Sequence, residues 1–319
     1  MRCLVTGGTG FVGRHLVAHL RAGGDAVDLL GRSAERCAVV ADLALAPPVL
    51  PAEPYDLVYH VAGKAHAVPR TEEERDAFFA TNVGGTRHLL DALDRQSRRP
   101  DALVLVSTVA VYGREAGEGL GEETPRAAGD PYGLSKRQAE DLVLEWGARY
   151  GVRVGVVRLP LVAGAGAPGN LGAMVRAIGR GRYLGVGGGA ARRSVVHAAD
   201  VAAVLPRVAQ RGGVYHLTDG AHPSFAEIER ALARALGKRP PRHLPDAVAR
   251  AGARVGDAVG RATGVRLPLD SRALGKMTST LTFDDALARR RLGWDPAPVL
   301  SRAAEWAASG AGSATSPVS

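Results

Sequence analysis

The chain has 319 residues, of which 46% are hydrophobic and 23% charged, and its formal net charge is +9. This length is enough to bury a large core in one large or two modest domains. Nearly all the basic residues are arginines spread along the chain, and no basic run is interleaved with aromatic residues, which argues against nucleic acid as a partner.

Cysteine usage and hydropathy indicate the compartment. Cys3 and Cys37 lie in or beside strand-like runs and have no partner motif, as expected for buried thiols in a reducing compartment. Polar and glycine residues interrupt the N-terminal apolar run, so no signal peptide is expected, and no apolar stretch reaches the length of a membrane span. The sequence therefore predicts a cytoplasmic protein without a membrane partner.

Strand-like and helix-like runs alternate as far as about residue 159, which is typical of a parallel sheet with helices on both faces. Strands are expected at 2–6, 26–30, 38–40, 56–61, 102–106 and 153–158, and helices from 11, over 72–95 with an interruption at Gly84-Gly85, and over 132–150. The predicted fold class is α/β, a doubly wound parallel sheet of the Rossmann type with a smaller C-terminal region.

A glycine-rich turn of sequence Thr-Gly-Gly-Thr-Gly-Phe-Val-Gly separates the first strand from the first helix. Gly7 permits the tight turn, Gly10 lets the backbone approach a pyrophosphate, and Gly13 allows the helix to pack closely on the strand. The start of the helix, at Phe11 and Val12, supplies free N–H groups and a partial positive charge to a diphosphate. The turn therefore predicts a dinucleotide cofactor, with an ordinary glycine turn as the alternative.

The end of the second strand decides which cofactor binds. A carboxylate there accepts hydrogen bonds from the adenosine ribose and repels a 2′-phosphate, whereas arginine favours that phosphate. Arg32 and Ser33 occupy this place and predict a preference for NADP(H) over NAD(H). Asp28, inside the strand, is a competing ribose ligand, and Asp42 is placed to accept a hydrogen bond from the adenine amino group.

A second constellation carries acid–base chemistry. Tyr132 and Lys136 share one face of a predicted helix because residues four apart lie on the same side. A nearby ammonium lowers the pKa of a phenol from its ordinary value of about 10, so the phenol becomes a usable acid or base near neutrality. Thr108, at the end of the fifth strand, would bind the same substrate oxygen. An ordinary helix surface is the alternative for the pair.

The regular alternation ends after Pro160, and short strand-like runs return at 195–196 and 214–217. The predicted organisation is a dinucleotide-binding domain over 1–160 with returning segments near 195–218, a mainly substrate-binding region over 161–309, and a frayed tail over 310–319.

These motifs together resemble those of the extended short-chain dehydrogenase/reductases, specifically the nucleotide-sugar epimerase/dehydratase family. The resemblance covers nearly the whole chain, and its marks are the glycine turn, Asp42-Leu43, His60-Val61-Ala62-Gly63, Asn82-Val83-Gly84-Gly85-Thr86, Ser107-Thr108 before Val111-Tyr112-Gly113, Tyr132 with Lys136, Arg193-Ser194-Val195-Val196-His197, and Gly293-Trp294. It implies that Thr108, Tyr132 and Lys136 are the catalytic residues.

The resemblance also implies the binding residues. Cofactor contacts are expected from Gly7, Gly10, Phe11, Val12, Gly13, Arg32, Ser33, Asp42, Leu43, Val61, Ala62, Gly63, Tyr132 and Lys136. Arg193 resembles the family's diphosphate-binding arginine, and Asn170 a residue that contacts the nucleotide sugar. Lys64 and His66 follow the fourth strand, where either can face the sugar or solvent. His60 is expected to be a satisfied core imidazole, and no metal-ligand spacing is present.

Two departures from the family pattern restrict which of the family's activities are expected. The family's 4,6-dehydratases place Asp-Glu directly after the catalytic threonine, whereas this chain has Val109-Ala110, so dehydration is not expected. Leu161 stands where the family usually has asparagine, so the substrate must sit differently from that of the common 4-epimerases. Residues 168–172 and 192–194 resemble a subgroup associated with bacterial surface polysaccharides, which includes 4-keto-sugar reductases.

The expected function is hydride transfer at hexose C4 of a nucleotide-diphosphate sugar, as an NADP(H)-preferring 4-keto-sugar reductase. A UDP-hexose 4-epimerase and a non-catalytic NADP-sensing protein are the alternatives. A homodimer is expected, with the helices around 76–93 and 139–146 as the candidate interface, although core packing explains their apolar stripes equally well.

Overall fold

A computed structural model describes residues 1–65, 69, 71–263 and 270–308. Its centre is a seven-stranded parallel sheet in the order β11-β7-β5-β4-β1-β2-β3. These strands are β1 (Arg2–Thr6), β2 (Ala26–Gly31), β3 (Val39–Val40), β4 (Leu57–His60), β5 (Ala102–Thr108), β7 (Arg153–Leu159) and β11 (Gly213–His216). The expected Rossmann-type fold is confirmed.

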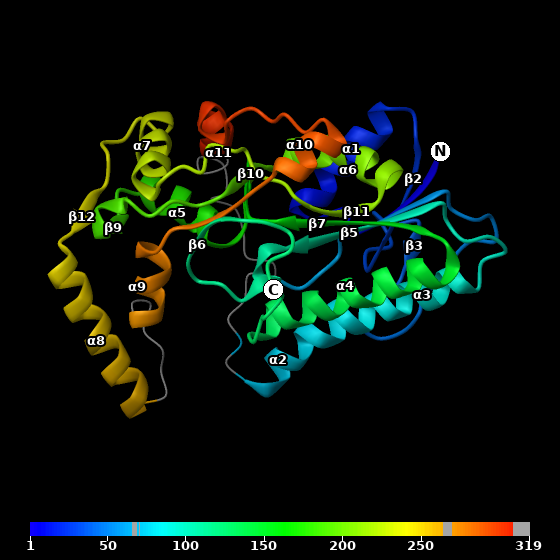
Figure 1. Ribbon diagram of the computed structural model, residues 1–319, viewed down its shortest axis with the longest axis horizontal. Helices are drawn as coiled ribbons and strands as arrows, with labels where there is room; N and C mark the ends of the chain where they lie inside the picture. Colours follow the sequence, from blue (N-terminus) through cyan, green and yellow to red (C-terminus); the bar gives the residue numbers. More distant parts are fainter. Residues whose placement is uncertain (66–68, 70, 264–269, 309–319) are drawn as a thin grey trace.

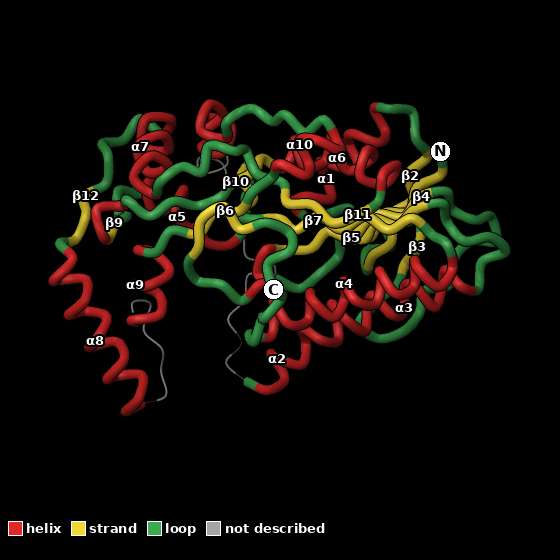
Figure 2. Tube along the Cα trace, viewed as in Figure 1, coloured by secondary structure: helices red, strands yellow, loops and turns green. Residues whose placement is uncertain are grey.

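Helices cover both faces of the sheet (Figures 1 and 2). One face carries α1 (Phe11–Ala22), α6 (Ala198–Arg211) and α10 (Ala286–Leu292), and the other carries α3 (Gly85–Asp94) and α4 (Pro131–Tyr150). Side chains alternate along β1, so that Cys3 and Val5 pack against the α1 side while Leu4 packs against the α3 side. Because both faces are covered, the central strands are mostly apolar, and their polar residues lie mainly near the strand ends.

The C-terminal region is built from small two-stranded sheets and short helices at one end of the molecule (Figure 1). Its strand pairs are β8 (Leu161–Ala163) with β10 (Val195–His197), β9 (Leu184–Val186) with β12 (Arg242–Leu244), and β6 (Gly117–Leu120) with β13 (Leu281–Phe283). Its helices are α5 (Gly169–Gly179), α7 (Phe225–Ala235), α8 (Asp246–Thr263), α9 (Ser271–Thr278) and α11 (Ala303–Ala307). Of the two returning runs, only β11 joins the large sheet.

The helix predicted over 72–95 is continuous rather than interrupted at its glycine pair. It consists of α2 (Glu72–Phe79), a π-helical turn over Ala80–Gly84, and α3. Glycine has low helix propensity, but Gly85 lies against the Leu43 side chain, where a larger residue would crowd it. The irregularity therefore precedes the expected break and is a widened turn, the kind of feature that is frequent at functional sites.

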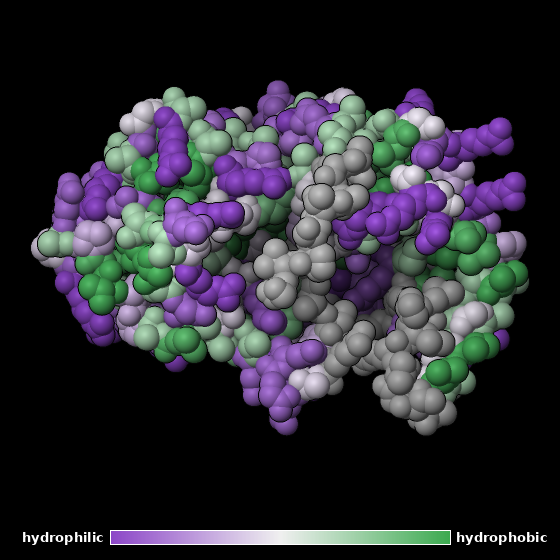
Figure 3. All heavy atoms as spheres, turned by 180° about the vertical axis from the view of Figure 1, so that it is seen from behind, coloured by the Kyte–Doolittle hydropathy of each residue, from purple (hydrophilic) through white to green (hydrophobic). Residues whose placement is uncertain are grey.

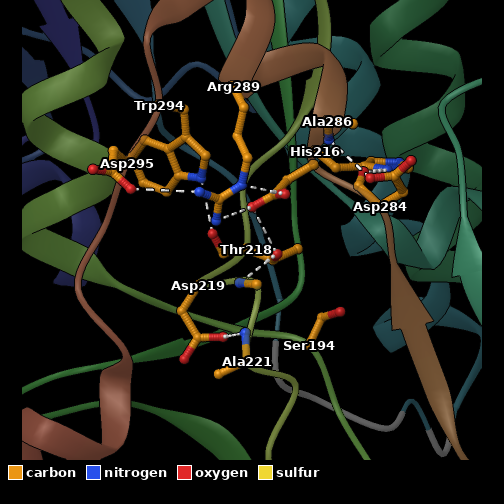
Figure 4. A network of polar contacts seen from close by, with 12 residues as sticks. Ser194, His216, Thr218, Asp219, Ala221, Asp284, Ala286, Arg289, Trp294 and Asp295 are labelled. Carbon is orange, nitrogen blue, oxygen red and sulfur yellow. Dashed lines mark hydrogen bonds and ion pairs between the residues drawn. The ribbon is translucent and has the colours of Figure 1, made fainter.

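A polar network joins the end of the large sheet to the segment that closes the C-terminal region (Figure 4). Thr218 donates a hydrogen bond to Asp285 over 3.0 Å, and Arg289 binds the same carboxylate through its Nε at 2.9 Å. The indole of Trp294 donates to the Thr218 carbonyl at 2.8 Å. These contacts anchor α10 to β11, so the closing segment belongs to the folded core.

Three further expectations can be compared with the structure. Cys3 is buried as expected, but Cys37 is only half-buried, because it lies in the loop after β2. Among the described residues, no helix is both long and apolar enough to cross a membrane. The tail expected over 310–319 lies outside the described residues.

Candidate active site

The glycine turn lies where the strand order reverses, at the carboxyl ends of β1 and β4. In open parallel sheets this is the place where ligands bind. Gly7 has φ +67°, and a Cβ on it would stand 2.6 Å from the Ala62 amide nitrogen, so the turn presses directly on the residues after β4. Val61, Ala62 and Gly63 are therefore beside the turn, as the cofactor-binding prediction requires.

The other two glycines of the turn have different neighbours. A Cβ on Gly13 would lie 2.1 Å from the Gly7 carbonyl oxygen, so this glycine packs the helix on the turn itself rather than on the strand as predicted. Around Gly10, the Gly7 carbonyl is the only described atom within 4 Å of the Cβ position. The space in front of Gly10 is open, which fits the approach of a pyrophosphate.

The start of α1 is free to bind an anion. Gly10 caps the helix without a side-chain hydrogen bond, and the first turn has no acidic residue. The amides of Phe11 and Val12, with the positive end of the helix dipole, thus face the open space before Gly10. A dinucleotide diphosphate fits this arrangement without a basic side chain.

The adenosine end of the predicted cofactor site contains Arg32, which is 82% exposed and lies 3.9 Å from Asp42. Asp28 is engaged elsewhere: its carboxylate accepts hydrogen bonds from Arg2 at 3.0 Å and from the Tyr55 hydroxyl at 2.9 Å. The competing ribose ligand therefore already has two partners. Arg32 keeps its guanidinium in solvent at the tip of β2.

The neighbouring loop is fixed by its backbone. One Asp42 carboxylate oxygen accepts a hydrogen bond from the Ala44 amide at 3.0 Å. Leu43 is buried, and its carbonyl accepts a hydrogen bond from the His88 ring at 2.8 Å. These bonds tie the adenosine side of the site to α3, while Ser33 remains half-buried at the start of the loop.

Thr108, Tyr132 and Lys136 come together at the carboxyl end of β5. Asp130 caps α4 by accepting from the Gly133 amide at 3.1 Å, and this cap starts the helix one residue before Tyr132. The Tyr132 hydroxyl is hydrogen-bonded to the Thr108 side chain. A substrate oxygen at this position would meet both hydroxyl groups.

The electrostatics of the tyrosine differ from the prediction. Burial raises the pKa of Tyr132, and the hydrogen bond with Thr108 opposes that rise only in part. The predicted lowering of this pKa by Lys136 is therefore not seen in the protein alone. The neutral phenol that results is suited to give a proton to a substrate oxygen.

Lys136 is 5% exposed, and its Nζ lies 3.8 Å from the position that a Cβ on Gly63 would occupy. Its ammonium thus reaches the end of β4, beside the predicted cofactor site. Burial lowers the pKa of Lys136 to about 8, while the negative charge of Glu140, one turn further along α4, acts in the opposite direction.

Glu140 was not singled out from the sequence. Its fully buried carboxylate accepts hydrogen bonds from Ser107 at 2.5 Å and from Arg158 at 2.8 Å, and Arg126 reaches it at 3.2 Å. Ser107 directly precedes Thr108, the threonine predicted to be catalytic. The carboxylate therefore links β5, β7 and the helix that carries Tyr132 and Lys136.

In the sequence Asn82 stands out only as part of a family motif, and the structure shows which groups its side chain contacts. It stands in the π-helical turn, donates to the Ser135 hydroxyl at 2.9 Å and to the Lys64 carbonyl at 3.1 Å, and accepts from the Lys64 amide at 2.8 Å. Ser135 in turn donates to the Tyr132 carbonyl. The widened turn thus places the Asn82 side-chain amide where it contacts both Ser135 on α4 and the Lys64 backbone after β4.

His60 is a satisfied core imidazole, as expected. Its Nδ1 lies 2.7 Å from the Thr6 hydroxyl and its Nε2 lies 3.0 Å from the Thr86 hydroxyl. Thr86 donates to the Asn82 carbonyl, so it accepts from His60, and the imidazole proton is on Nε2. Burial lowers the pKa of His60 to about 3, which keeps the ring neutral.

The predicted substrate residues are not all brought together. Lys64 lies with its ammonium 5.6 Å from the Phe78 ring centre, and that ring packs against Tyr132 at 6.1 Å, so Phe78 connects Lys64 to the predicted catalytic tyrosine. His66 lies outside the described residues. Asn170 is exposed in the first turn of α5, and no described contact joins it to the catalytic residues.

Arg193 has partners that the resemblance does not suggest. Its guanidinium donates to the carbonyls of Lys276 and Ser279 at the end of α9, and to that of Arg192 at 2.9 Å. It also lies over the Phe225 ring at 5.2 Å. In this structure the arginine caps α9, and a diphosphate would have to share it. Among the described residues, no group of three or more histidine, cysteine or acidic residues could hold a metal ion.

The geometry defines a dinucleotide-binding protein of the Rossmann type with a threonine, a tyrosine and a lysine at the carboxyl end of its sheet, the arrangement of a nicotinamide-dependent enzyme. The model of the "NAD dependent epimerase/dehydratase family" matches residues 3–217. The chain belongs to this family, and it is an NAD(P)-dependent enzyme of the extended short-chain dehydrogenase type.

Three similar proteins illustrate the range of the family. A UDP-glucose 4-epimerase of Vibrio cholerae is 29% identical over 318 residues, covering 93% of this chain and 91% of the epimerase. A 4-hydroxy-2-methyl-3-oxo-4-farnesyl-3,4-dihydroquinoline-1-oxide ketoreductase of Stigmatella aurantiaca is 34% identical over 238 residues, covering 69% of each chain. The solved structure of MoeE5 with UDP-glucuronic acid and NAD has a TM-score of 0.74 and 25% identity, and covers 97% of this chain and 98% of its own.

Proposed function

We propose that the protein is an NADP(H)-preferring reductase of nucleotide-diphosphate 4-keto sugars in surface polysaccharide or glycoside biosynthesis. The observation that carries the proposal is the contact between Thr108 and Tyr132, with Lys136 buried one helical turn away. Two hydroxyl groups and one ammonium then surround the position where a carbonyl oxygen is reduced. Val109 and Ala110 offer no acid or base for the elimination of water, which disfavours a dehydratase.

When bound, the nicotinamide cofactor supplies hydride chemistry at C4 of the sugar. The residues of the chain do the rest: Tyr132 gives its phenolic proton to O4, and Thr108 orients O4 through a hydrogen bond. Lys136 holds the nicotinamide ribose beside Gly63, and its positive charge favours the phenolate that proton donation leaves behind. Asn82 and Ser135 keep Tyr132 in place.

The preference for NADP(H) is proposed on the surroundings of Arg32. Its guanidinium is 82% exposed, and Asp28, the competing ribose ligand, is bound to Arg2 and Tyr55. A 2′-phosphate can therefore reach a planar fork of donors, which it would share with the Asp42 carboxylate 3.9 Å away. A reductase needs a cofactor that exchanges after each turnover, which NADPH in solution provides.

We propose a cytoplasmic location, which suits a nucleotide-sugar substrate and the two free thiols. We also propose a homodimer through the helices over 76–93 and 139–146, where Val83, in the π-helical turn, is half-buried. Size-exclusion chromatography with light scattering tests this assembly, and a monomer at micromolar concentration would contradict it.

The rival function is a UDP-hexose 4-epimerase, and one experiment separates the two. The purified protein is first denatured and its released cofactor identified. The native protein is then incubated with NADPH and a panel of UDP- and dTDP-4-keto sugars, and with UDP-glucose alone. Net oxidation of NADPH by a keto sugar supports the reductase. Tightly held NAD with interconversion of UDP-hexoses would replace it by the epimerase, and no turnover on any substrate would favour a non-catalytic NADP sensor.

A further inference from the structure

The charges of the chain are unevenly divided. Residues 1–160 contain 19 Lys and Arg against 21 Asp and Glu, whereas residues 161–319 contain 22 against 11. Within the second part, the segments 169–186 and 225–260 together contain ten basic residues and four acidic ones. The arginines are therefore not dispersed in the way that the sequence suggested, and most of the excess charge comes from two short segments.

The fold gathers these two segments at one end of the molecule, which we call the basic end. There α5 contacts α7, β9 pairs with β12, and α8 contacts the turn Gly187–Gly189 (left side of Figure 1). All ten basic side chains are exposed, and none forms an ion pair with a described residue. They are Arg176, Arg180, Arg182, Arg230, Arg234, Lys238, Arg239, Arg242, Arg250 and Arg254.

The same end exposes apolar side chains. Val248 is 54% exposed and Val255 60%, and because they are seven residues apart on α8 they lie on one face of the helix. Ala251 and Ala258 lie between and beyond them on that face and are exposed too. Leu184, on the neighbouring strand β9, is 53% exposed. Figure 3, seen from behind, shows green and purple side chains adjoining at this end, on the right of the view.

The exposed valine face of α8 is separate from the face by which this helix packs on the rest of the protein. Ala249 and Ala253 are buried and form a small core with Val186 and Leu274, so the helix is already held on the protein by its other side. At 100° per residue, Ala251 and Ala258 lie beside the valines around the helix, and Arg254 and then Arg250 lie beyond these alanines on the same side. An apolar stripe bordered by arginines is the pattern of a helix that lies in the plane of a membrane surface.

We propose that the basic end docks on an anionic lipid bilayer, with the valine face of α8 in the headgroup region and the surrounding arginines on anionic lipids. Each arginine close to such a surface adds to the electrostatic attraction. Burial of the apolar stripe among the lipids adds a further stabilisation, which a partner that offers only charge would not provide. A second copy of the chain would bring two basic ends together and be repelled. Nucleic acid would satisfy the arginines but leave the valines in water.

This proposal revises the expectation of a protein without a membrane partner, which rested on the lack of a spanning segment. Surface binding needs no span. The proposal also stands apart from the proposed function, because none of its residues belongs to the catalytic or cofactor site. A substrate carried on a lipid would meet the enzyme at the same surface, but docking does not require one.

Vesicle sedimentation tests the proposal with the full-length protein. We expect binding to vesicles of phosphatidylcholine mixed with phosphatidylglycerol, little binding to phosphatidylcholine alone, and loss of binding at high salt. Arg250→Gln/Arg254→Gln should weaken partitioning by about twenty-five-fold, at a factor of five per arginine. Arg95→Gln/Arg211→Gln removes two exposed arginines elsewhere and should leave partitioning nearly unchanged.

The apolar part has its own pair of variants. Val248→Ser/Val255→Ser should weaken binding severalfold, whereas Leu45→Ser/Val49→Ser, which removes two exposed apolar side chains outside the basic end, should not. Circular dichroism and unchanged turnover confirm that each variant is folded. Equal binding to neutral vesicles, equal effects of the two arginine pairs, or a change of oligomeric state in the valine variant with no change in vesicle binding would each overturn the proposal.

Discussion

In residues 1–160 several charged side chains pair with each other: Arg158 binds Glu140 beneath the helix that carries Tyr132, and Arg98 joins Asp56 to Asp101 at the start of the sheet. In the C-terminal region the basic side chains of the basic end point to solvent without acidic partners. The first region uses charge to position groups around a reaction, and the second presents charge to a partner. Variants that act on one region and not the other can test this division.

The largest effect is expected in the catalytic cluster. In the proposed mechanism Tyr132→Phe removes the proton that O4 requires, so this variant should lower kcat by roughly 10²- to 10⁴-fold on the true substrate. The dissociation constant for NADPH should stay within a few fold, since the ring and its contact with Phe78 remain. Steady-state kinetics and fluorescence titration measure the two. Full turnover by this variant would remove Tyr132 from the mechanism.

The next largest effect is on stability. Glu140→Gln leaves the buried Arg158 without its countercharge and should lower the free energy of unfolding by about 3–5 kcal/mol, as measured by chemical denaturation. Glu145→Gln changes an exposed carboxylate on the same helix and should cost less than about 0.5 kcal/mol. Similar losses in the two variants would show that the buried network does not support the dinucleotide-binding region.

The proposed preference for NADP(H) rests on one exposed arginine. Arg32→Asp should weaken NADP binding by roughly 10- to 150-fold, because a charge-assisted bond to phosphate contributes about 1.5–3 kcal/mol, and should strengthen NAD binding relative to it. Arg21→Asp, on α1 away from the predicted site, is the matched change of charge. Dissociation constants of the unmodified protein and of both variants for NAD and NADP test this prediction. Equal affinities of the unmodified protein for the two cofactors would contradict the preference for NADP.

The pH dependence reports on Lys136. Its pKa is lowered to about 8 by burial, so the free enzyme carries the ammonium below that pH and loses it above. We expect kcat/KM to be level below about pH 8 and to fall tenfold per pH unit above it. Glu140→Gln removes a charge that raises this pKa, so the alkaline limb should move to lower pH. A limb that does not move would assign the titration to another group.

The smallest effect is expected in the segment that closes the C-terminal region. Thr218→Val removes the hydrogen bond to Asp285 and should lower the free energy of unfolding by about 1–2 kcal/mol. Hydrogen exchange should increase in β13 and α10 while β4 and β5 remain protected. Equal loss of protection in all four elements would show that the two regions unfold as one.

Much of the fold was predictable because its causes are local. The alternation of apolar runs and helical patterns located β1, β2, β5 and α4 to within about two residues, since both periodicities are properties of short segments. The glycine motif predicted the tight turn at Gly7 and the free start of α1 for the same reason. The π-helical turn was missed because it depends on how Asn82 and Gly85 meet other elements.

The sequence by itself determined the fold class and the family, and it predicted Thr108, Tyr132 and Lys136 as catalytic residues, because motifs and periodicities follow from residue type and spacing along one element. Only the tertiary structure decided that burial, rather than Lys136, governs the pKa of Tyr132, that Arg193 caps α9, and that Glu140 lies under the catalytic helix. It also decided that arginines from two segments form one basic end. These properties depend on which distant segments become neighbours, and the charge and desolvation of a site are set by those neighbours.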